Sequence, residues 1–420
     1  MSLIGVAVKP GARRSKRGRG VVTKRTRNHL DDLRGVSRLA IEATRSITDL
    51  VEAMNLTIGG GPAILGRPLV IPTRAITGLV YGSIRGVTRL VGAGIDRALA
   101  QLAPLVPEDA PGPEREAVLA VLNGVLGDYL SATGNPLAIR MQLRQGGRPL
   151  ELERRALKAL LPQAGGKLLL LLHGSCLNDR KWLRLGHDHG AALARDLGYT
   201  PVYLLYNSGL HISTNGRAFA ALLEELVAAW PVPIDELVIL GHSMGGLVAR
   251  SACHYGEAAG HHWRRKLDKL VCLGSPHHGA MLERGGSWLE LLLGVSRYSA
   301  PLARLGKIRS AGVTDMRFGL VLDEHWEDRE RFAQPWDPRS QLKLPDGVEC
   351  YAIAGTTAPG PQGKLPGDGL VSVDSALGRH RKPELTLAFP EAHQWIGFGM
   401  GHVDLLHRAE VYETLRGWLR

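Results

Sequence analysis

The chain has 420 residues, of which 44% are hydrophobic and 5% aromatic, which is enough for one large domain with an appended region. Its net charge of +12 is uneven: residues 1–150 carry +10 and residues 151–420 only +2, which argues against nucleic-acid binding by the chain as a whole. The four cysteines include no C-x-x-C pair, so neither a disulfide framework nor a structural zinc site is expected.

The N-terminal part is predicted to be basic and then helical. Residues 1–28 hold nine Lys/Arg and no acid, which is typical of a disordered basic arm; a tether to anionic lipid is the alternative. Residues 29–103 form a predicted helical region whose apolar positions recur at helical spacing. An intramolecular helix pair is favoured there over contact with another copy or with a membrane surface. Residues 104–113 are a Pro-rich linker.

No segment has the pattern of a secretory signal, and none is apolar over the length needed to cross a bilayer. A cytoplasmic location is therefore expected, with a peripheral position at a membrane surface, through residues 1–103, as the alternative.

Residues 114–166 are predicted to lead into a catalytic domain at 167–420. The lead-in contains helices at 114–131 and 151–161 and a strand at 137–143. Strands are then expected at 168–172, 200–206, 237–240, 267–273, 348–354 and 384–389, with helices at 190–197, 213–230 and 403–419. This alternation predicts an α/β fold with a doubly wound, mostly parallel sheet and helices on both faces. The pattern breaks over about 281–345, which is a predicted lid or cap insertion.

The stretch Leu237–Gly246 carries the strongest chemical signal. An apolar strand is followed by Gly-His-Ser-Met-Gly-Gly and then by a helix, which places a G-x-S-x-G motif at a strand–helix turn. Small residues at Gly241 and Gly245 let strand and helix approach closely. The helix N-terminus faces any oxyanion formed at Ser243. The pattern predicts a nucleophilic serine.

Later stretches supply partners for this serine in the chain order Ser, Asp, His. Asp368 follows the strand predicted at 348–354 and is suited to orient a histidine. His402 precedes the last helix and is the expected general base. Asp374 is the alternative acid, and His380, His393 and His407 are the alternative bases. A loop at His173–Cys176 ends an apolar strand and can aim a main-chain N–H at an oxyanion, together with the N–H of Met244.

These motifs resemble the lipase/esterase branch of the α/β-hydrolase superfamily. They are also similar to bacterial proteins related to inositol deacylases that act on glycolipid anchors. The matching segments are LLLLHGS, GHSMGGLVAR, LGSPHHGA, GDGLVSVDSA and GHVDLL, within about two thirds of the chain. The resemblance implies Ser243 as nucleophile, Asp368 as acid and His402 as base. It also implies that Ser175, or in its place Cys176, supplies the first oxyanion-hole N–H and Met244 the second.

The remaining site residues are expected around the substrate. The predicted pocket residues are His173, Gly174, Cys176, His242, His277 and His278. Related lipases bind calcium near the catalytic histidine, where Asp404 stands here, but no second ligand is evident. No metal and no cofactor are therefore predicted. The motif His187-Asp188-His189 is interpreted as a polar surface turn.

The resulting functional hypothesis is a serine carboxylester hydrolase that cleaves an acyl ester of a lipid or another apolar substrate. An acyltransferase or an inositol-deacylase-like lipid deacylase on the same site is the alternative. A hypothesis of another class is a membrane- or granule-surface interaction protein that uses the basic helical N-terminal region. No specific nucleic-acid binding is expected.

Overall fold

The computed structural model describes residues 112–280, 310–327, 340, 342–363 and 365–420. The predicted basic arm, the helical region 29–103, nearly all of the Pro-rich linker and much of the predicted lid insertion lie outside these residues. Among the described helices, none is both long and apolar enough to cross a membrane.

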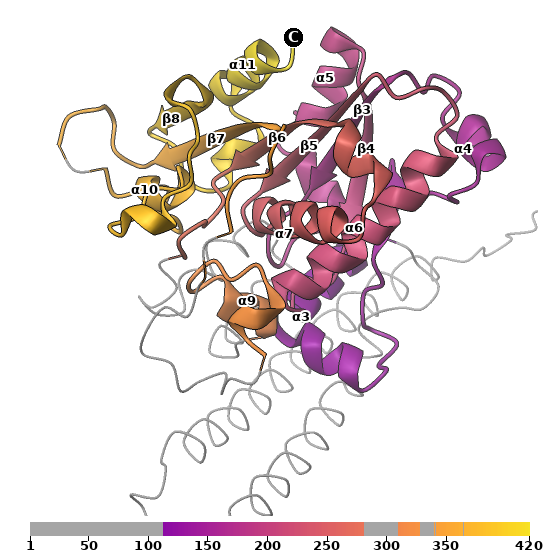
Figure 1. The fold of residues 1–420 in the computed structure, drawn as a ribbon, viewed down its shortest axis with the longest axis horizontal. Coiled ribbons are helices and arrows are strands. Elements are labelled where there is room, and N and C mark those ends of the chain that lie inside the picture. The colour runs from indigo at the N-terminus through magenta and orange to yellow at the C-terminus, as the bar shows by residue number, and fades with distance from the viewer. Residues whose placement is uncertain (1–111, 281–309, 328–339, 341, 364) are drawn as a thin grey trace, which may run out of the picture.

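An eight-stranded sheet organises the described residues, in the order β2-β1-β4-β3-β5-β6-β7-β8 (Figure 1). The first strand, β1, is antiparallel to both of its neighbours, and the strands from β4 to β8 are parallel. The strands are β1 Gln142–Gln145, β2 Arg148–Pro149, β3 Lys167–Leu172, β4 Thr200–Leu205, β5 Glu236–His242, β6 Leu267–Leu273, β7 Glu349–Thr356 and β8 Gln394–Phe398.

The helices cover both faces of this sheet. They are α3 Pro113–Ala132, α4 Arg154–Leu160, α5 His189–Leu197, α6 Ile212–Ala229, α7 Met244–Ala258, α9 Ala311–Asp315, α10 Val373–Ala376 and α11 Ala409–Trp418, and the short 3₁₀ turns are η3 Asp179–Trp182, η4 His262–Lys266, η6 Asp323–His325, η7 Pro383–Leu385, η8 Glu391–His393 and η9 Asp404–Leu406. Figure 1 shows α6 and α7 packed side by side against one face.

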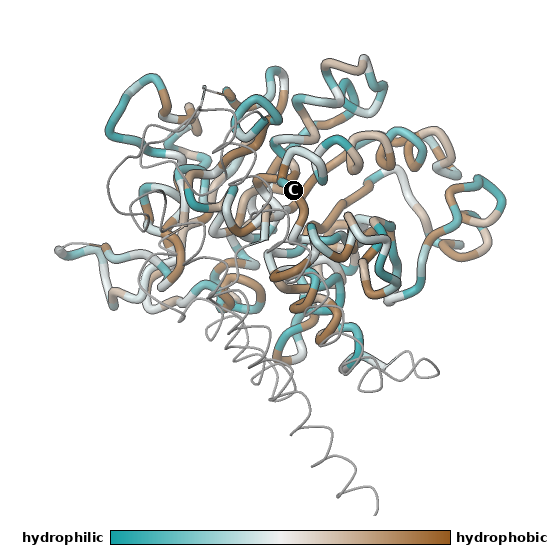
Figure 2. The backbone as a smooth tube through the Cα atoms, turned by 90° about the horizontal axis from the view of Figure 1, so that it is seen from below, coloured by the Kyte–Doolittle hydropathy of each residue, from teal (hydrophilic) through white to brown (hydrophobic). Residues whose placement is uncertain are grey.

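The alternation of side chains along the strands explains the two layers. Leu168, Leu170 and Leu172 belong to a core shared with α3, α6 and α7, whereas Leu169 and Leu171 belong to a second core shared with α5 and α11. Successive strand residues point to opposite faces, so a strand that is apolar throughout must be covered on both sides. Hydrophilic stretches lie on the outer loops in Figure 2. The predicted doubly wound sheet with helices on both faces is confirmed.

Two element predictions are corrected by the structure. The last strand is β8, not residues 384–389, which form the turn η7 and an extended segment between Pro383 and Pro390. Leu387 and Phe389 are buried in the core instead of in the sheet. The strand predicted at 137–143 begins only at Gln142, where it pairs with β4. The sheet therefore extends N-terminal to the boundary drawn at 167.

Within the range of the predicted lid, residues 310–327 pack on the rest of the domain. Ser310 donates a hydrogen bond to the carbonyl of Gly124 in α3, and Asp315 accepts one from the N–H of Ile212 at the start of α6. A Cβ on Gly312 would lie 3.2 Å from the side chain of Met244. This segment thus lies next to the start of α7.

Candidate active site

Ser243 lies at the sharp turn between β5 and α7. Its backbone angles, φ 55° and ψ −123°, are strained for a residue with a side chain and cost about 1–3 kcal/mol. The turn is held because the Ser243 N–H donates to the carbonyl of Leu273 at 2.8 Å. A Cβ on Gly245 would lie 2.3 Å from the carbonyl oxygen of Leu172, so only glycine allows this approach. The expected elbow geometry is present.

Asp368 and His402 form a buried pair. His402 Nδ1 lies 2.7 Å from Asp368 Oδ2, and neither side chain has exposed surface. The other carboxylate oxygen, Oδ1, accepts the N–H groups of Leu370 and Val371 at 3.0 and 2.8 Å. The His402 N–H donates to the Asp368 carbonyl at 2.9 Å. Two main-chain donors therefore fix the carboxylate, which in turn orients the imidazole.

Gly274, directly after β6, lies close to the Asp368–His402 pair and follows the residue that binds the Ser243 N–H. A Cβ at Gly274 would lie 3.3 Å from His402 Cε1 and 3.2 Å from Asp368 Oδ2, while the residue before it, Leu273, accepts the Ser243 N–H. His402 Nε2 is buried and has no hydrogen-bond partner among the described residues. The imidazole thus has one nitrogen committed to Asp368 and one available to a hydroxyl.

The loop after β3 lies against the elbow. A Cβ on Gly174 would lie 3.0 Å from Ser243 Cβ. The Cys176 N–H is already bonded to Ser208 Oγ at 3.0 Å. Within the described part of the chain, the main-chain N–H groups of Ser175 and Met244 have no acceptor. Of the two alternatives left open by the sequence, the geometry favours Ser175 over Cys176. Burial also raises the pKa of the Cys176 thiol to about 12, which disfavours a thiolate there.

His173 supports this loop. Its ring stacks on Tyr206 at 4.2 Å, its Nδ1 donates to the Gly174 carbonyl at 2.8 Å, and its own carbonyl accepts the Tyr206 hydroxyl at 2.7 Å. Burial lowers the pKa of His173 to about 4, so the ring is neutral at physiological pH. These contacts hold the loop that follows β3.

His242 contacts the candidate base itself. Its Nε2 lies 3.1 Å from the carbonyl oxygen of His402, to which it must donate, and the two rings are 4.8 Å apart. Trp182 packs edge-on against the His242 ring. Burial holds the pKa of His242 well below its usual value, which keeps the ring neutral. Neither Trp182 nor this contact gave any signal in the sequence, because both depend on elements far apart in the chain.

His277 and His278 lie at a different place. The His278 ring lies 2.8 Å from the carbonyl of Gly378, and His277 Nδ1 lies 3.4 Å from Arg250. Both histidines line a cavity of about 20 Å³, which has room for a water molecule at most. Their contacts support the segment after β6, and their expected place around the substrate remains a prediction.

The alternative acid and bases have other surroundings. Asp374 is exposed on α10, and its carbonyl accepts the Arg379 N–H. The alternative histidines contact their own loops or β7. His380 Nδ1 accepts the Lys382 N–H at 3.1 Å, His393 Nδ1 lies 3.2 Å from the Cys350 carbonyl oxygen, and His407 Nε2 lies 3.9 Å from Asp404 Oδ1. Only Asp368 and His402 are brought together.

No group of three or more His, Cys, Asp or Glu within the described residues is arranged to hold a metal ion. Asp404 instead accepts the Gly401 N–H at 2.8 Å and shapes the loop that carries His402. The interpretation of residues 187–189 as a surface turn is wrong for His189, which is buried. His187 Nε2 and His189 Nδ1 lie 2.9 Å apart, because α5 begins between them.

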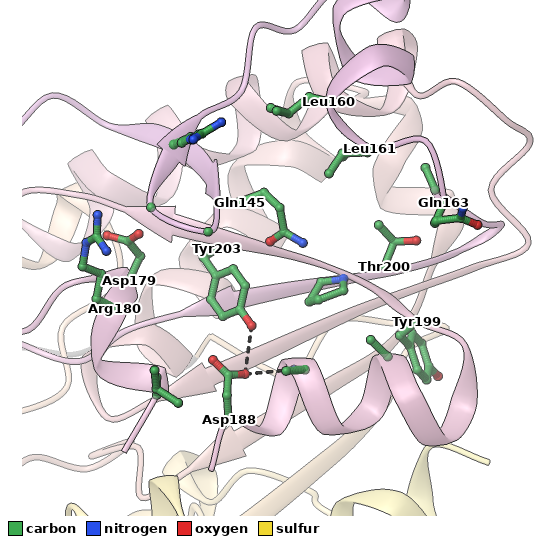
Figure 3. A pocket seen from close by; sticks show the side chains of 18 of the residues that line it. Gln145, Leu160, Leu161, Gln163, Asp179, Arg180, Asp188, Tyr199, Thr200 and Tyr203 are labelled. Atoms are coloured by element: carbon green, nitrogen blue, oxygen red, sulfur yellow. Dashed lines mark hydrogen bonds between the residues drawn. The ribbon is translucent and has the colours of Figure 1, made fainter. Parts of the chain in front are cut away.

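Two pockets lie on the side of η3 and α5. The larger, of about 990 Å³, lies between the β1–β2 hairpin, α4 and α5, with Tyr203 donating to Asp188 at its floor (Figure 3). None of its lining residues belongs to the predicted site. The smaller, of about 220 Å³, is lined by residues that include Leu177, in the loop after β3, and Val403, which follows His402 in the chain. Of these two pockets, the smaller is the one that includes a chain neighbour of a candidate triad residue.

The comparisons with known proteins give one family match over part of the chain. Residues 216–337, which include the elbow, match the family described as PGAP1-like alpha/beta domain. The search of curated proteins found no match.

Among solved structures, the chain is similar to the mature lipase BlEst2 of Bacillus licheniformis (18% identity, 60% of this chain and 91% of that chain, TM-score 0.39). It is also similar to esterase PF2001 of Pyrococcus furiosus (14%, 61% and 84%, TM-score 0.35) and to a soluble variant of the monoglyceride lipase of Saccharomyces cerevisiae (14%, 61% and 86%, TM-score 0.36). These likenesses are distant. The chain's own strand order and strained elbow give the α/β-hydrolase fold.

Proposed function

We propose that this protein is a serine carboxylester hydrolase whose nucleophile is Ser243. The observation that carries the proposal is the buried Asp368–His402 pair beside a strained serine, with His402 Nε2 unpartnered among the described residues. A structural ion pair would not need a second, unsatisfied ring nitrogen in a buried place. A general base does need it.

The proposed reaction is two-step acyl transfer to water. His402 Nε2 takes the proton of Ser243 Oγ as the oxygen attacks the ester carbonyl, and Asp368 stabilises the imidazolium that forms. The main-chain N–H groups of Ser175 and Met244 hold the oxyanion; loss of one such donor costs about 3 kcal/mol of transition-state stabilisation. The alcohol leaves with the proton from His402, and water activated by the same ring releases the acid.

We further infer that the substrate is an acyl ester of a lipid. The match of residues 216–337 to the PGAP1-like family supports this class, together with the resemblance to inositol deacylases. The pocket of about 220 Å³ that includes Val403 is lined by leucines, which fit an aliphatic group, and by Lys181 and Arg184, which suit an anionic headgroup.

Hydrolysis of medium-chain p-nitrophenyl esters by the full chain tests the proposal. Wild type should release p-nitrophenol and react with a fluorophosphonate probe, and Ser243→Ala should do neither. Ser131→Ala, an exposed serine at the end of α3, is the matched control and should behave as wild type. Equal activity or equal inactivity of wild type and Ser243→Ala across a chain-length panel would refute the proposal. Formation of a new ester from an added alcohol, in preference to hydrolysis, would identify an acyltransferase instead.

A further inference from the structure

A turn beside the candidate site exposes two leucines to solvent. Leu183 and Leu185 are 64% and 81% exposed, and a tight turn closed by mutual main-chain hydrogen bonds between Arg184 and His187 presents them. Among the described residues, the other exposed large hydrophobic side chain is Leu160 in α4, which is 40% exposed. Single exposed leucines are ordinary, but two on one turn indicate a contact surface.

The backbone of this turn does not favour leucine. Leu185 has φ +48° and is followed by Gly186 at +81°, so both residues are in the left-handed region. A leucine there is strained, and glycine or asparagine would fit more easily. Because the Leu185 side chain is almost fully exposed, packing within the described residues does not compensate for this strain. A partner outside the domain would do so.

Two cations flank the leucines. Lys181 and Arg184 have no acidic partner among the described residues, and Arg184 Nε is buried without a hydrogen-bond partner there. Burial, and then the nearby Arg184, lowers the pKa of Lys181, which indicates that the two charges are uncompensated. An apolar tip between unpaired cations is complementary to a surface that is anionic outside and apolar within.

The turn lines a pocket that also includes Val403, the residue after His402. Leu183 and Leu185 line this pocket of about 220 Å³ together with Val403 and Leu406. Val403 directly follows the candidate base. A lipid surface against the turn would therefore meet the pocket at its mouth.

We propose that residues 181–185 dock the catalytic domain on an anionic lipid bilayer, with Leu183 and Leu185 inserted among the acyl chains and Lys181 and Arg184 at the headgroups. The docked turn brings a lipid ester to the pocket beside His402. The second part rests on the proposed function, whereas the docking itself does not.

The test compares the full-length wild type with the double variant Leu183→Ser/Leu185→Ser and the matched control Leu160→Ser. Each is assayed on one medium-chain p-nitrophenyl ester, once in vesicles and once in free solution below its solubility limit, so that the same acyl group enters the pocket in both assays. The ratio of the two rates is reported, so that any general change in activity divides out. The double variant should lower this ratio by about tenfold, because it removes the apolar insertion, and the control should leave the ratio as in wild type.

Co-sedimentation separates docking from catalysis. Vesicles of phosphatidylcholine with phosphatidylserine are used at high salt, where binding through the basic residues 1–28 is screened. Wild type and Leu160→Ser should sediment, and the double variant should not. At low salt, vesicles of phosphatidylcholine alone should bind less wild-type protein than vesicles that also contain phosphatidylserine. The double variant Lys181→Gln/Arg184→Gln should make this difference smaller. An enzyme that is inactive in both assays but shows this binding pattern would refute the proposed function while supporting the docking.

Other results would overturn the docking proposal. One is a double variant with an unchanged rate ratio and unchanged sedimentation. Another is a Leu160→Ser variant whose rate ratio and sedimentation fall as much as those of the double variant. The third is equal binding of wild type to vesicles with and without phosphatidylserine. A concentration-dependent dimer of wild type that the double variant lacks, measured by light scattering, would assign the turn to a second copy of the chain.

Discussion

Replacement of Asp368 by asparagine tests the geometry of the candidate triad most directly. In the structure, Oδ1 of Asp368 accepts two main-chain N–H groups, and Oδ2 faces His402 Nδ1. An asparagine must keep its carbonyl oxygen at the Oδ1 position to satisfy those donors. Its NH₂ group is then directed at His402 Nδ1 and requires that nitrogen to accept. The proton of the neutral imidazole moves to Nε2, where it blocks uptake of the Ser243 proton.

The expected loss in kcat is about 10⁴-fold, which corresponds to roughly 5 kcal/mol of transition-state stabilisation. The fold should survive, because every hydrogen bond at Asp368 has a replacement partner. The loss should therefore fall on kcat, while the midpoint of thermal unfolding stays close to that of wild type.

The assay is steady-state hydrolysis of a p-nitrophenyl ester together with a thermal melt of each variant. Asp374→Asn is the matched control, since Asp374 is the exposed carboxylate nearest in sequence and should keep full activity. If Asp368→Asn keeps activity within about tenfold of wild type, or if Asp374→Asn shows the larger loss, the assignment of Asp368 as the orienting acid is wrong.

Three further results are expected. His242→Leu removes the donor to the His402 carbonyl and should lower kcat by about tenfold, whereas His242→Gln, which can still donate, should recover most of it; a loss of stability alone in both would argue against a positioning role. Gly245→Ala would place a Cβ 2.3 Å from a carbonyl oxygen of β3 and should lower the free energy of unfolding in urea by about 2 kcal/mol, a loss that an unchanged midpoint would contradict. Burial lowers the pKa of His173 and of His189 from 6.5 to about 4. Between these pH values the unfolded state binds more protons than the folded state, so the free energy of unfolding falls as the pH falls. Each histidine should lower it by about 2 kcal/mol between pH 6.5 and pH 5. Urea unfolding at the two pH values measures this loss, and His189→Gln should show a smaller one.

The local pattern of the sequence was sufficient for the elbow and for most of the parallel sheet. The run Leu168–Leu172 is apolar at every position, so it had to lie between two helical layers. Gly241 and Gly245 around Ser243 indicated a close approach of strand and helix, and the structure has that approach. These features depend on neighbours in sequence, which is why periodicity and small residues identify them.

The strand at the far end of the sheet could not be located in the same way. Residues 384–389 alternate as a strand would, yet β8 is Gln394–Phe398, whose partner is the edge of β7. The prolines at 383 and 390 bound the wrong segment, and Leu387 and Phe389 are buried against the core instead. Which of two short apolar segments joins a sheet depends on the edge available to it, not on the segment itself.

The sequence by itself determined the order of Ser243, Asp368 and His402 and therefore the class of chemistry to test. The tertiary structure alone decided which groups meet. It committed the Cys176 N–H to Ser208, left the Ser175 N–H without an acceptor among the described residues, and placed His242 under the His402 carbonyl. The Cys176–Ser208 contact joins the loops that follow β3 and β4, and the His242–His402 contact joins the end of β5 to the loop that follows β8. Parallel strands bring their carboxyl ends to one edge, and only the packing of the loops at that edge decides which donor faces which acceptor.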